Sequence, residues 1–283
     1  MSARLLDGRD VASHLRRDLK HRVERLTEGD AATTPQLAIL RSGADNSAAL
    51  YAASLERAAR SVGVEPLLIA DETDPLLATI SRLNADPTVA GIVIAQPSSD
   101  PEHGRRLVER IDPAKDVDGA TPTNAGWLAR GQPAFVPATA LAVIAILEAY
   151  DIPVAGRRAV IIGRSAVVGR PVASLLVARD ATVVICHRAT RNLARETRRA
   201  EILVAAAGVP GLVRAEMVNR SSVVIDCGIN AVTGGIVGDV EFSAVALIVK
   251  AISPVPGGIG PVTPMMVLRQ TVESAERRAG RSP

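Results

Sequence analysis

Apolar residues in the first half of the chain follow two alternating patterns, one typical of helices and one typical of buried strands. The helical spacing recurs in five segments: residues 9–28, 48–62, 75–84, 105–111 and 137–150. Short apolar runs at residues 37–40, 65–70 and 90–94 separate the first four of them. Ser47 is placed to cap the second helix and Gly63 to end it. Strands that alternate with helices in this way predict parallel βαβ units.

The second half of the chain repeats the alternation. Strand-like runs occur at residues 159–162, 182–186, 202–206 and 222–226. Helices are expected from residue 169, at 193–199 and at 215–218. Residues 251–263 form a loop rich in glycine and proline, which leads to a last helix over residues 264–277. The predicted fold class is therefore α/β, with two βαβ lobes that the helix at residues 137–150 bridges.

The clearest local motif follows the strand at residues 159–162. Gly163 permits a tight turn, and Gly169 permits the next helix to pack closely on the sheet. The free N–H groups and the positive dipole at the start of such a helix favour a phosphate. Ser165 replaces the middle glycine of the common dinucleotide-binding pattern, so the motif is weak by itself. A strand–turn–helix crossover that holds no ligand is the alternative.

Loops at the carboxyl ends of parallel strands are where functional side chains gather. This rule places residues 42–47, 96–99 and 116–118 near one rim of the first lobe. In the loop at residues 251–263, prolines and a Gly-Gly pair fix the backbone and let a ligand approach closely. A plain connector between domains is the alternative for that loop.

Composition narrows the class of protein further. The chain of 283 residues is 47% hydrophobic and carries 33 basic and 30 acidic residues, a mixed surface that does not predict nucleic-acid binding. Cys186 and Cys227 lie in apolar runs, so buried free thiols and no metal site are expected. The absence of a signal-peptide pattern and of a membrane-spanning run predicts a cytoplasmic protein. The only lysines are Lys20, Lys115 and Lys250.

Four blocks stand out together: Lys-Asp-Val-Asp-Gly at residues 115–119, the glycine turn at 163–171, Val-Ile-Asp-Cys-Gly-Ile-Asn at 224–230, and Pro-Val-Pro-Gly-Gly-Ile-Gly-Pro-Val-Thr at 254–263. With these blocks, the chain resembles the bifunctional methylenetetrahydrofolate dehydrogenase/methenyltetrahydrofolate cyclohydrolase family over essentially its whole length. The resemblance implies a folate-binding catalytic domain of residues 1–140 plus 262–283. It also implies an NAD(P)-binding, Rossmann-like domain of residues 141–261, a cleft between the two domains, and a homodimer.

The resemblance also implies roles for particular residues. Tyr51 and Asp118 would be catalytic and would bind the tetrahydrofolate substrate together with Pro256, Gly257 and Gly258. Cofactor contacts would come from Gly163, Arg164, Ser165, Val168, Gly169, Arg188, Arg191 and Ile229. The implied reaction transfers a hydride from 5,10-methylenetetrahydrofolate to a nicotinamide, after which water opens the methenyl product. A half-buried core tyrosine and a turn aspartate are the alternatives for Tyr51 and Asp118.

The sequence also bears on the choice between NADP and NAD as the cofactor. Arg188 and Arg191 follow the strand at residues 182–186, and Arg164 lies in the glycine turn. An acidic residue after this strand would bind the ribose hydroxyls of NAD, whereas arginines suit the additional phosphate of NADP. NADP is therefore the predicted cofactor, with NAD as the second choice. A solvated basic rim is the alternative interpretation.

Two positions depart from what the resemblance implies. A lysine is expected four residues after Tyr51, on the same helix face, where this chain has Leu55. A glutamine is expected where this chain has Ala95. Gln96 is one residue away, which in a strand reverses the face unless a bulge intervenes.

These two departures have different consequences for hydride transfer and for hydrolysis. Hydride transfer between bound rings requires positioning and no obligatory proton donor, whereas hydrolysis requires acid–base catalysis that leucine does not supply. The expected activity is therefore an NADP-dependent methylenetetrahydrofolate dehydrogenase with weak or absent cyclohydrolase activity. Two alternatives stay open: an enzyme that acts on another pterin or one-carbon substrate, and a non-catalytic folate- or nucleotide-binding protein.

Overall fold

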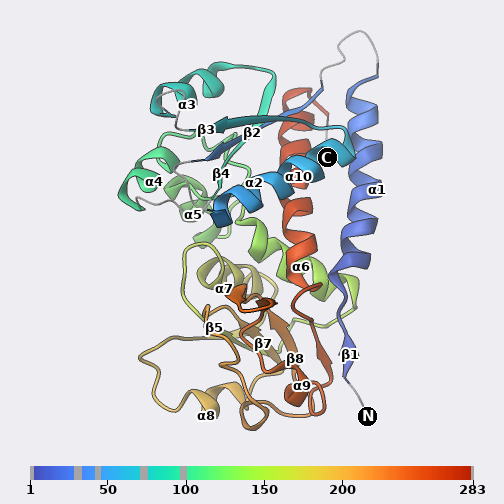
Figure 1. The fold of residues 1–283 in the computed structure, drawn as a ribbon, viewed down its shortest axis with the longest axis vertical. Coiled ribbons are helices and arrows are strands. Elements are labelled where there is room, and N and C mark those ends of the chain that lie inside the picture. Colours follow the sequence, from blue (N-terminus) through green and yellow to red (C-terminus); the bar gives the residue numbers. More distant parts are fainter. Residues whose placement is uncertain (1–2, 29–33, 42–45, 71–75, 96–100, 282–283) are drawn as a thin grey trace. The chain divides into compact units, whose positions relative to one another are not determined.

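The computed structural model of the protein describes residues 3–28, 34–41, 46–70, 76–95 and 101–281. The chain divides into two compact units, which are named by the size of their parallel sheets (Figure 1). The six-stranded unit combines Met1–Ala12 with Thr139–Thr263. The three-stranded unit combines Ser13–Ala138 with Pro264–Pro283.

The three-stranded unit is built on a sheet with the strand order β3-β2-β4. Its strands are β2 (Gln36–Arg41), β3 (Glu65–Ala70) and β4 (Val89–Ala95), and both strand pairs are parallel. Every residue of β4 is buried, which fits its unbroken run of small and β-branched residues. The helices of this unit are α2 (Asn46–Val62), α3 (Leu76–Ala85), α4 (Pro101–Val108), α5 (Pro122–Ala129) and most of α1 (Gly8–Leu26) and α10 (Ile259–Arg278).

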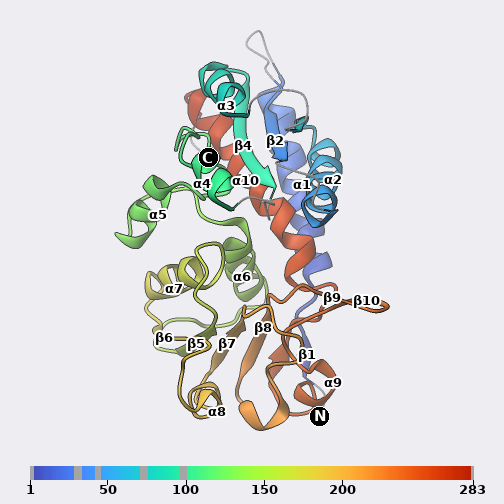
Figure 2. The same ribbon diagram turned by 60° about the vertical axis from the view of Figure 1, so that its left-hand side comes forward.

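The six-stranded unit has the strand order β1-β11-β8-β7-β5-β6, with every neighbouring pair parallel. The strands are β1 (Arg4–Leu5), β11 (Ala251–Ile252), β8 (Val223–Asp226), β7 (Ile202–Ala205), β5 (Arg158–Ile162) and β6 (Thr182–Cys186). The helices are α6 (Ala138–Ala149), α7 (Gly169–Val177), α8 (Leu193–Thr197) and α9 (Phe242–Val245), with a short 3-10 helix at Ala215–Met217. A hairpin of β9 (Asn230–Val232) and β10 (Gly235–Val237) projects from the sheet (Figure 2).

The α/β class with two parallel sheets is confirmed, and several predicted strands match the structure closely. The runs at residues 65–70 and 182–186 coincide with β3 and β6. Two helix starts in the first half of the chain are wrong. The helix α2 begins at Asn46, so Ser47 lies inside it and not before it, and α4 begins at Pro101 and not at residue 105. The helix α5 was not predicted, although Thr121 caps it by accepting a 3.3 Å hydrogen bond from the Asn124 backbone N–H.

The last helix departs furthest from its predicted start. It begins at Ile259 and contains Pro264, whereas the sequence predicts a loop up to residue 263. Pro261 falls in the first turn, where a backbone N–H has no helical partner to lose. Pro264 removes one further backbone donor, and the long buried helix tolerates this loss. The glycines and prolines of this segment do favour a loop locally, but tertiary packing of the helix outweighs that preference.

The N-terminal residues belong with the six-stranded unit, which differs from the predicted domain division. The strand β1 pairs with β11, with Arg4 opposite Ala251 and Leu5 opposite Ile252. Figure 1 shows this blue strand beside the orange strands of the C-terminal half of the chain. A two-residue strand carries too little pattern to be recognised in the sequence, because its partner lies far along the chain.

Candidate active site

The glycine turn after β5 draws the ends of three neighbouring strands together. The Gly163 N–H donates a 2.8 Å hydrogen bond to the Cys186 carbonyl at the end of β6. Gly163 has a φ of 123°, and a Cβ atom there would lie 2.1 Å from the carbonyl oxygen of Ala206, just after β7. Both the backbone conformation and the space therefore require glycine.

Ser165 and Gly169 close the turn onto the first residues of α7. The Val168 N–H donates to the Ser165 hydroxyl at 3.1 Å, and the Arg170 N–H donates to the Ser165 carbonyl at 3.1 Å. A Cβ atom at Gly169 would lie 2.2 Å from the Gly163 carbonyl oxygen. Ser165 thus supplies a hydrogen bond within the turn where the common motif has a glycine. No side chain caps α7 at Val168, so the start of this helix is suited to an anion.

The strand order places this turn at a topological switch point. The chain moves from β5 to β6 on one side and then to β7 on the other, and ligands of open α/β sheets bind outside the carboxyl ends of the strands at such a point. Arg164, Arg188 and Arg191 are all exposed on the turns that follow β5 and β6. In the described part of the chain, none of these arginines forms an ion pair with an acidic side chain. Ile229 is also exposed, after β8.

Two buried aspartates, to which the sequence analysis assigned no role, hold the loops after β7 and β8. The Asp239 carboxylate accepts hydrogen bonds of 2.6–3.0 Å from the backbone N–H groups of residues 207, 208 and 209, and one of 2.9 Å from the Asn230 side chain. Asp226 accepts backbone hydrogen bonds from Gly228, Asp239 and Val240. Burial raises the pKa of Asp226 to about 6, against the opposing effect of these hydrogen bonds.

Both cysteines are free, as expected, although Cys227 is only partly buried. Desolvation, together with the charges of Asp226 and Asp239, raises the pKa of the Cys227 thiol strongly. A thiol in this environment stays protonated and is a poor nucleophile.

In the three-stranded unit, Tyr51 and Asp118 lie within electrostatic range of each other. Burial, and secondly the charge of Asp118, raise the pKa of the half-buried Tyr51 well above its ordinary value. Asp118 accepts a 3.1 Å hydrogen bond from the Ala138 N–H. Desolvation raises the pKa of Asp118 to about 7, and the charge of Asp116 adds to the rise. Asp118 is therefore a carboxyl group that changes its charge near neutral pH.

Leu55 and Ala95 stand where the resemblance implies a lysine and a glutamine, and both are fully buried. Leu55 belongs to the apolar stripe of α2, which also contains Ala48, Ala52, Ala59 and Val62. The pairing of β2 with β4 is regular from Leu37–Gly91 to Arg41–Ala95, and its irregularity lies at the opposite end, between Gln36 and Leu37. Gln96, Ser98 and Ser99 lie outside the described residues.

The Pro-Gly-Gly loop packs against the N-terminal segment of the six-stranded unit. The Gly8 N–H donates a 2.8 Å hydrogen bond to the Gly257 carbonyl, and the Gly258 N–H donates to the Pro254 carbonyl at 2.7 Å. The Val255–Pro256 peptide is cis. Pro256, Gly257 and Gly258 thus belong to the same unit as the glycine turn, while Tyr51 and Asp118 belong to the other.

The described residues contain neither a metal-binding cluster nor a membrane-spanning helix. No group of three or more His, Cys, Asp or Glu side chains is arranged there to hold a metal ion. No helix in the same residues is long and apolar enough to cross a membrane.

The fold and the glycine turn define the class of protein: an α/β protein with a dinucleotide-binding domain. Two family models match the chain, the tetrahydrofolate dehydrogenase/cyclohydrolase catalytic domain at residues 6–118 and the NAD(P)-binding domain of the same family at residues 137–279. The chain belongs to the tetrahydrofolate dehydrogenase/cyclohydrolase family, which confirms the resemblance.

Individual relatives cover nearly the whole chain. The bifunctional protein FolD of Parafrankia sp. (strain EAN1pec) is 47% identical over 96% of this chain and 99% of its own length. The crystal structure of the bifunctional FolD enzyme of Campylobacter jejuni matches with a TM-score of 0.93 and 38% identity, over 98% of this chain and 100% of the other. The Trypanosoma brucei enzyme, solved with NADP and an inhibitor, matches with a TM-score of 0.91 and 33% identity, over 99% of each chain.

Proposed function

We propose that the protein oxidises 5,10-methylenetetrahydrofolate to 5,10-methenyltetrahydrofolate with NADP, and that its cyclohydrolase activity is weak or lost. Membership of the family and the intact glycine turn support the dehydrogenase reaction. The observation that carries the second part is Leu55, a fully buried apolar side chain four residues after Tyr51.

Hydride transfer depends on how two rings are held. In this proposal Gly163, Ser165, Val168 and Gly169 bind the phosphates, and Ile229 contacts the nucleotide. Asp118 and Tyr51, with Pro256, Gly257 and Gly258, bind the folate. When bound, the nicotinamide supplies the redox chemistry, and the protein supplies position and exclusion of water.

Hydrolysis needs a group that accepts a proton from water and a group that protonates the leaving amine. Tyr51 is a poor base because its raised pKa keeps the phenol protonated. Lys115 is engaged elsewhere, since its ammonium group donates 2.6 Å hydrogen bonds to the carbonyls of Leu83 and Asp86. Lys20 is exposed on α1, and Lys250 belongs to the six-stranded unit. All three lysines of the chain therefore lie outside α2, the helix on which the resemblance implies a lysine at position 55.

The test measures both reactions on the same preparation. We expect turnover of methylenetetrahydrofolate with NADP, and hydrolysis of methenyltetrahydrofolate lower by about 10²–10⁴-fold than in a lysine-bearing relative, as loss of acid–base catalysis predicts. In Leu55→Lys, hydrolysis rises while the dehydrogenase rate stays within a few fold. Leu55→Met is the matched control, because it introduces a long unbranched side chain, as lysine does, but without an amine. A hydrolysis rate for the unaltered protein equal to that of the relative would overturn the proposal.

A second candidate function follows from the same apolar positions. With Leu55 and Ala95 both buried and apolar, the site suits an enzyme that acts on another pterin or one-carbon substrate. Tight binding of NADP without turnover of methylenetetrahydrofolate would favour this candidate, or a non-catalytic binding protein, over the dehydrogenase.

We also propose NADP over NAD, and a homodimer. Arg164, Arg188 and Arg191 support the choice of NADP because they leave exposed cations near the end of β6. Val232, Ile236 and Val237 are exposed apolar side chains on the hairpin, which supports association with a second copy of the chain. Light scattering coupled to gel filtration measures the mass in solution, and a monomer at micromolar concentration would refute the dimer.

A further inference from the structure

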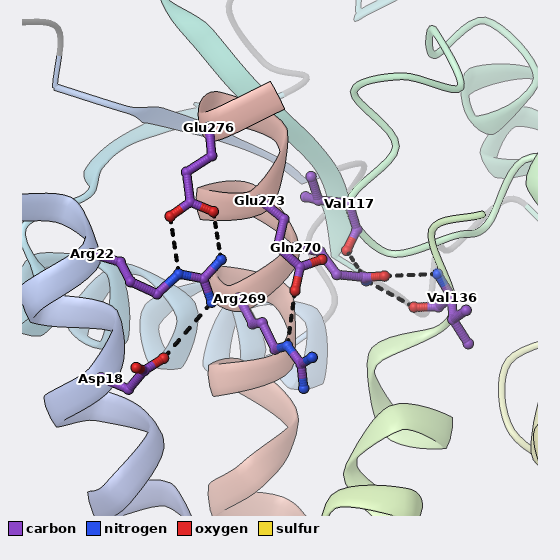
Figure 3. Close-up of polar contacts among 8 residues, drawn as sticks. All are labelled: Asp18, Arg22, Val117, Val136, Arg269, Gln270, Glu273 and Glu276. Atoms are coloured by element: carbon purple, nitrogen blue, oxygen red, sulfur yellow. Dashed lines mark hydrogen bonds and ion pairs between the residues drawn. The ribbon is translucent and has the colours of Figure 1, made fainter. Parts of the chain in front are cut away.

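Gln270 lies on α10 with its side chain buried in the three-stranded unit, and its amide makes three hydrogen bonds to backbone groups far away in sequence. Its oxygen accepts a 2.8 Å hydrogen bond from the Val136 N–H. Its nitrogen donates to the carbonyl of Val117 at 2.7 Å and to the carbonyl of Val136 at 2.8 Å. Figure 3 shows the amide reaching from α10 between these two segments. Gln270 is only 3% exposed, so these bonds have no competition from bulk water.

The two segments that Gln270 joins are those that create the surroundings of Asp118. Val117 directly precedes Asp118, and Val136 lies two residues before Ala138, whose N–H donates to the Asp118 carboxylate at 3.1 Å. The segments also touch directly. A Cβ atom at Gly119 would lie 2.5 Å from the Phe135 carbonyl oxygen and 2.6 Å from the Cα of Val136. A small shift of either segment would therefore move the Asp118 carboxylate relative to its backbone donor.

A second set of buried contacts holds the same two segments from the other side. The Asn124 side chain accepts a 3.2 Å hydrogen bond from the Phe135 N–H and donates a 2.8 Å hydrogen bond to the Asp116 carboxylate. Asp116 in turn accepts backbone hydrogen bonds from Ala120 and Thr121. Asp118 is thus placed by a network that closes through one side chain on α10.

The helix that carries Gln270 is itself anchored. The Arg22 guanidinium of α1 forms a two-pronged ion pair with Glu276, with N–O distances of 3.0 and 2.6 Å. Both side chains are largely buried, and Asp18 lies 3.7 Å from the same guanidinium (Figure 3). A fixed helix gives the Gln270 amide a fixed position.

We propose that Gln270 is a positioning residue for folate binding: its amide locks residues 117 and 136 together and so fixes the carboxylate of Asp118 toward the pterin ring. This inference rests on the proposed role of Asp118 in binding the folate. Gln270 itself touches no substrate in this scheme. Only an amide serves here, because the site presents one N–H donor and two carbonyl acceptors at the same time.

The first test replaces the amide by a side chain of similar length without hydrogen-bonding groups, in Gln270→Met. We expect the dissociation constant for tetrahydrofolate, measured by titration calorimetry on the full chain, to rise between about tenfold and hundredfold, as misplacement of a binding group by a fraction of an ångström predicts. The dissociation constant for NADP stays unchanged, because the nucleotide motif belongs to the other unit. Thr271→Val is the matched control. It removes a buried hydroxyl of the same helix, whose hydrogen bond goes to the Val267 carbonyl within that helix.

The second test uses Gln270→Glu. In this variant we expect the affinity for tetrahydrofolate to depend on pH in the opposite direction to the unaltered protein. If Asp118 binds the folate as a carboxylate, the affinity of the unaltered protein for tetrahydrofolate should rise with pH through about 7, where Asp118 ionises. Tyr51 from α2 and Asp116 from the same loop are the titratable groups that act on Asp118, and Ala138 supplies its backbone donor. The introduced carboxyl group donates and accepts only while it is protonated. The affinity of Gln270→Glu therefore falls with rising pH, opposite to the unaltered protein, and this variant gives a result even if Gln270→Met fails to fold.

The decisive comparison is with Asp118→Ala and with the double variant that carries both changes. If Gln270 acts through Asp118, the double variant binds tetrahydrofolate no more weakly than Asp118→Ala alone. Independent, additive losses would overturn the positioning role while leaving the binding role of Asp118 intact. An Asp118→Ala variant with unchanged affinity would instead overturn the proposed role of Asp118, and the positioning role with it. Equal losses of affinity in Gln270→Met and Thr271→Val would mark Gln270 as a structural residue only.

Discussion

The glycine turn of the six-stranded unit and the α2–β4 region of the three-stranded unit differ in which part of the chain their proposed functions depend on, the backbone or the side chains. The turn works through backbone shape, and Gly163 and Gly169 are kept where any Cβ atom would meet a carbonyl oxygen at 2.1 or 2.2 Å. The α2–β4 region works through side chains, and there Leu55 and Ala95 are apolar and fully buried. A backbone motif cannot change without damage to the sheet, whereas a side chain on a helix face can become apolar and gain core packing. The proposed loss of hydrolysis, with hydride transfer retained, rests on this contrast.

The largest effect is expected from breaking the backbone motif. In Gly163→Ala, the new methyl group meets the Ala206 carbonyl oxygen at 2.1 Å, and φ is 123°. We expect a loss of about 2–4 kcal/mol in the free energy of unfolding. We also expect binding of NADP to weaken by about a hundredfold or more, because the turn can no longer close. Urea denaturation and calorimetric titration with NADP measure the two effects.

Gly211→Ala is the matched control for this variant. Gly211 also has a positive φ, 60°, but a Cβ atom there would have nothing within 4 Å. It should cost only the backbone strain of about 1–2 kcal/mol and leave NADP affinity unchanged. If Gly163→Ala behaved like Gly211→Ala, the close approach of β5 and β7 would not matter for the cofactor.

The next effect concerns the loop after β7, which lies beside the glycine turn in the sheet. Asp239→Asn replaces a carboxylate oxygen by an NH₂ group that faces backbone N–H donors at residues 207–209 and cannot accept from them. We expect the free energy of unfolding to fall by about 2–3 kcal/mol, as for a lost charge-assisted hydrogen bond in a buried site, and NADP affinity to fall by about tenfold. Asp180→Asn, at an exposed position, should stay within about 0.5 kcal/mol. A stability loss without any change in NADP affinity would show that this loop does not contact the cofactor.

The parts of the fold that the sequence predicted are those whose signals are local. The strands Glu65–Ala70 and Thr182–Cys186 each consist of a polar first residue and an apolar run that ends before a polar residue, and they were predicted with their correct ends. The strand β1 and the start of α10 were not found, because each depends on a partner far along the chain. Pro264 inside α10 is a clear case: its local preference for a loop is outweighed by the packing of a long helix.

The candidate site shows the same difference between residues with a local sequence signal and residues that depend on distant partners. Gly163 and Gly169 were identified from a recognisable turn, and Tyr51 and Asp118 from a family resemblance. The sequence did not predict a role for Gln270, because its hydrogen-bond partners are 134 and 153 residues away in the chain. Nothing in the run Leu-Arg-Gln-Thr distinguishes a glutamine that joins two backbone segments from one that faces water. Residues that hold other residues in place have no sequence pattern of their own, and only the structure identifies them.

The third prediction concerns charge in the three-stranded unit. Folding raises the pKa of Asp118 from 3.8 to about 7, so the folded protein holds this proton over a pH range in which the unfolded chain has released it. Stability therefore falls as the pH rises from about 4 to about 7. In Asp118→Asn, this part of the pH dependence of the melting temperature should disappear. The KM for methylenetetrahydrofolate, which should fall up to about tenfold as Asp118 ionises, should no longer respond to pH in this range. An unaltered pH profile in the variant would assign the titration to another group.

The smallest effect is expected at the exposed arginines of the six-stranded unit, where solvent weakens each charge. Arg188→Ala should raise the KM for NADP by about fivefold, since an exposed ion pair is worth about 1 kcal/mol, and should leave the KM for NAD unchanged. The difference should shrink as salt is added, because ions screen an exposed guanidinium from a phosphate. Arg199→Ala, another exposed arginine after α8, serves as the control and should not distinguish the two cofactors. Equal changes in both KM values would mean that Arg188 supports the shape of the turn. In that case the six-stranded unit would bind its cofactor through backbone groups alone. The contrast with the three-stranded unit, whose proposed chemistry depends on side chains, would then be stronger.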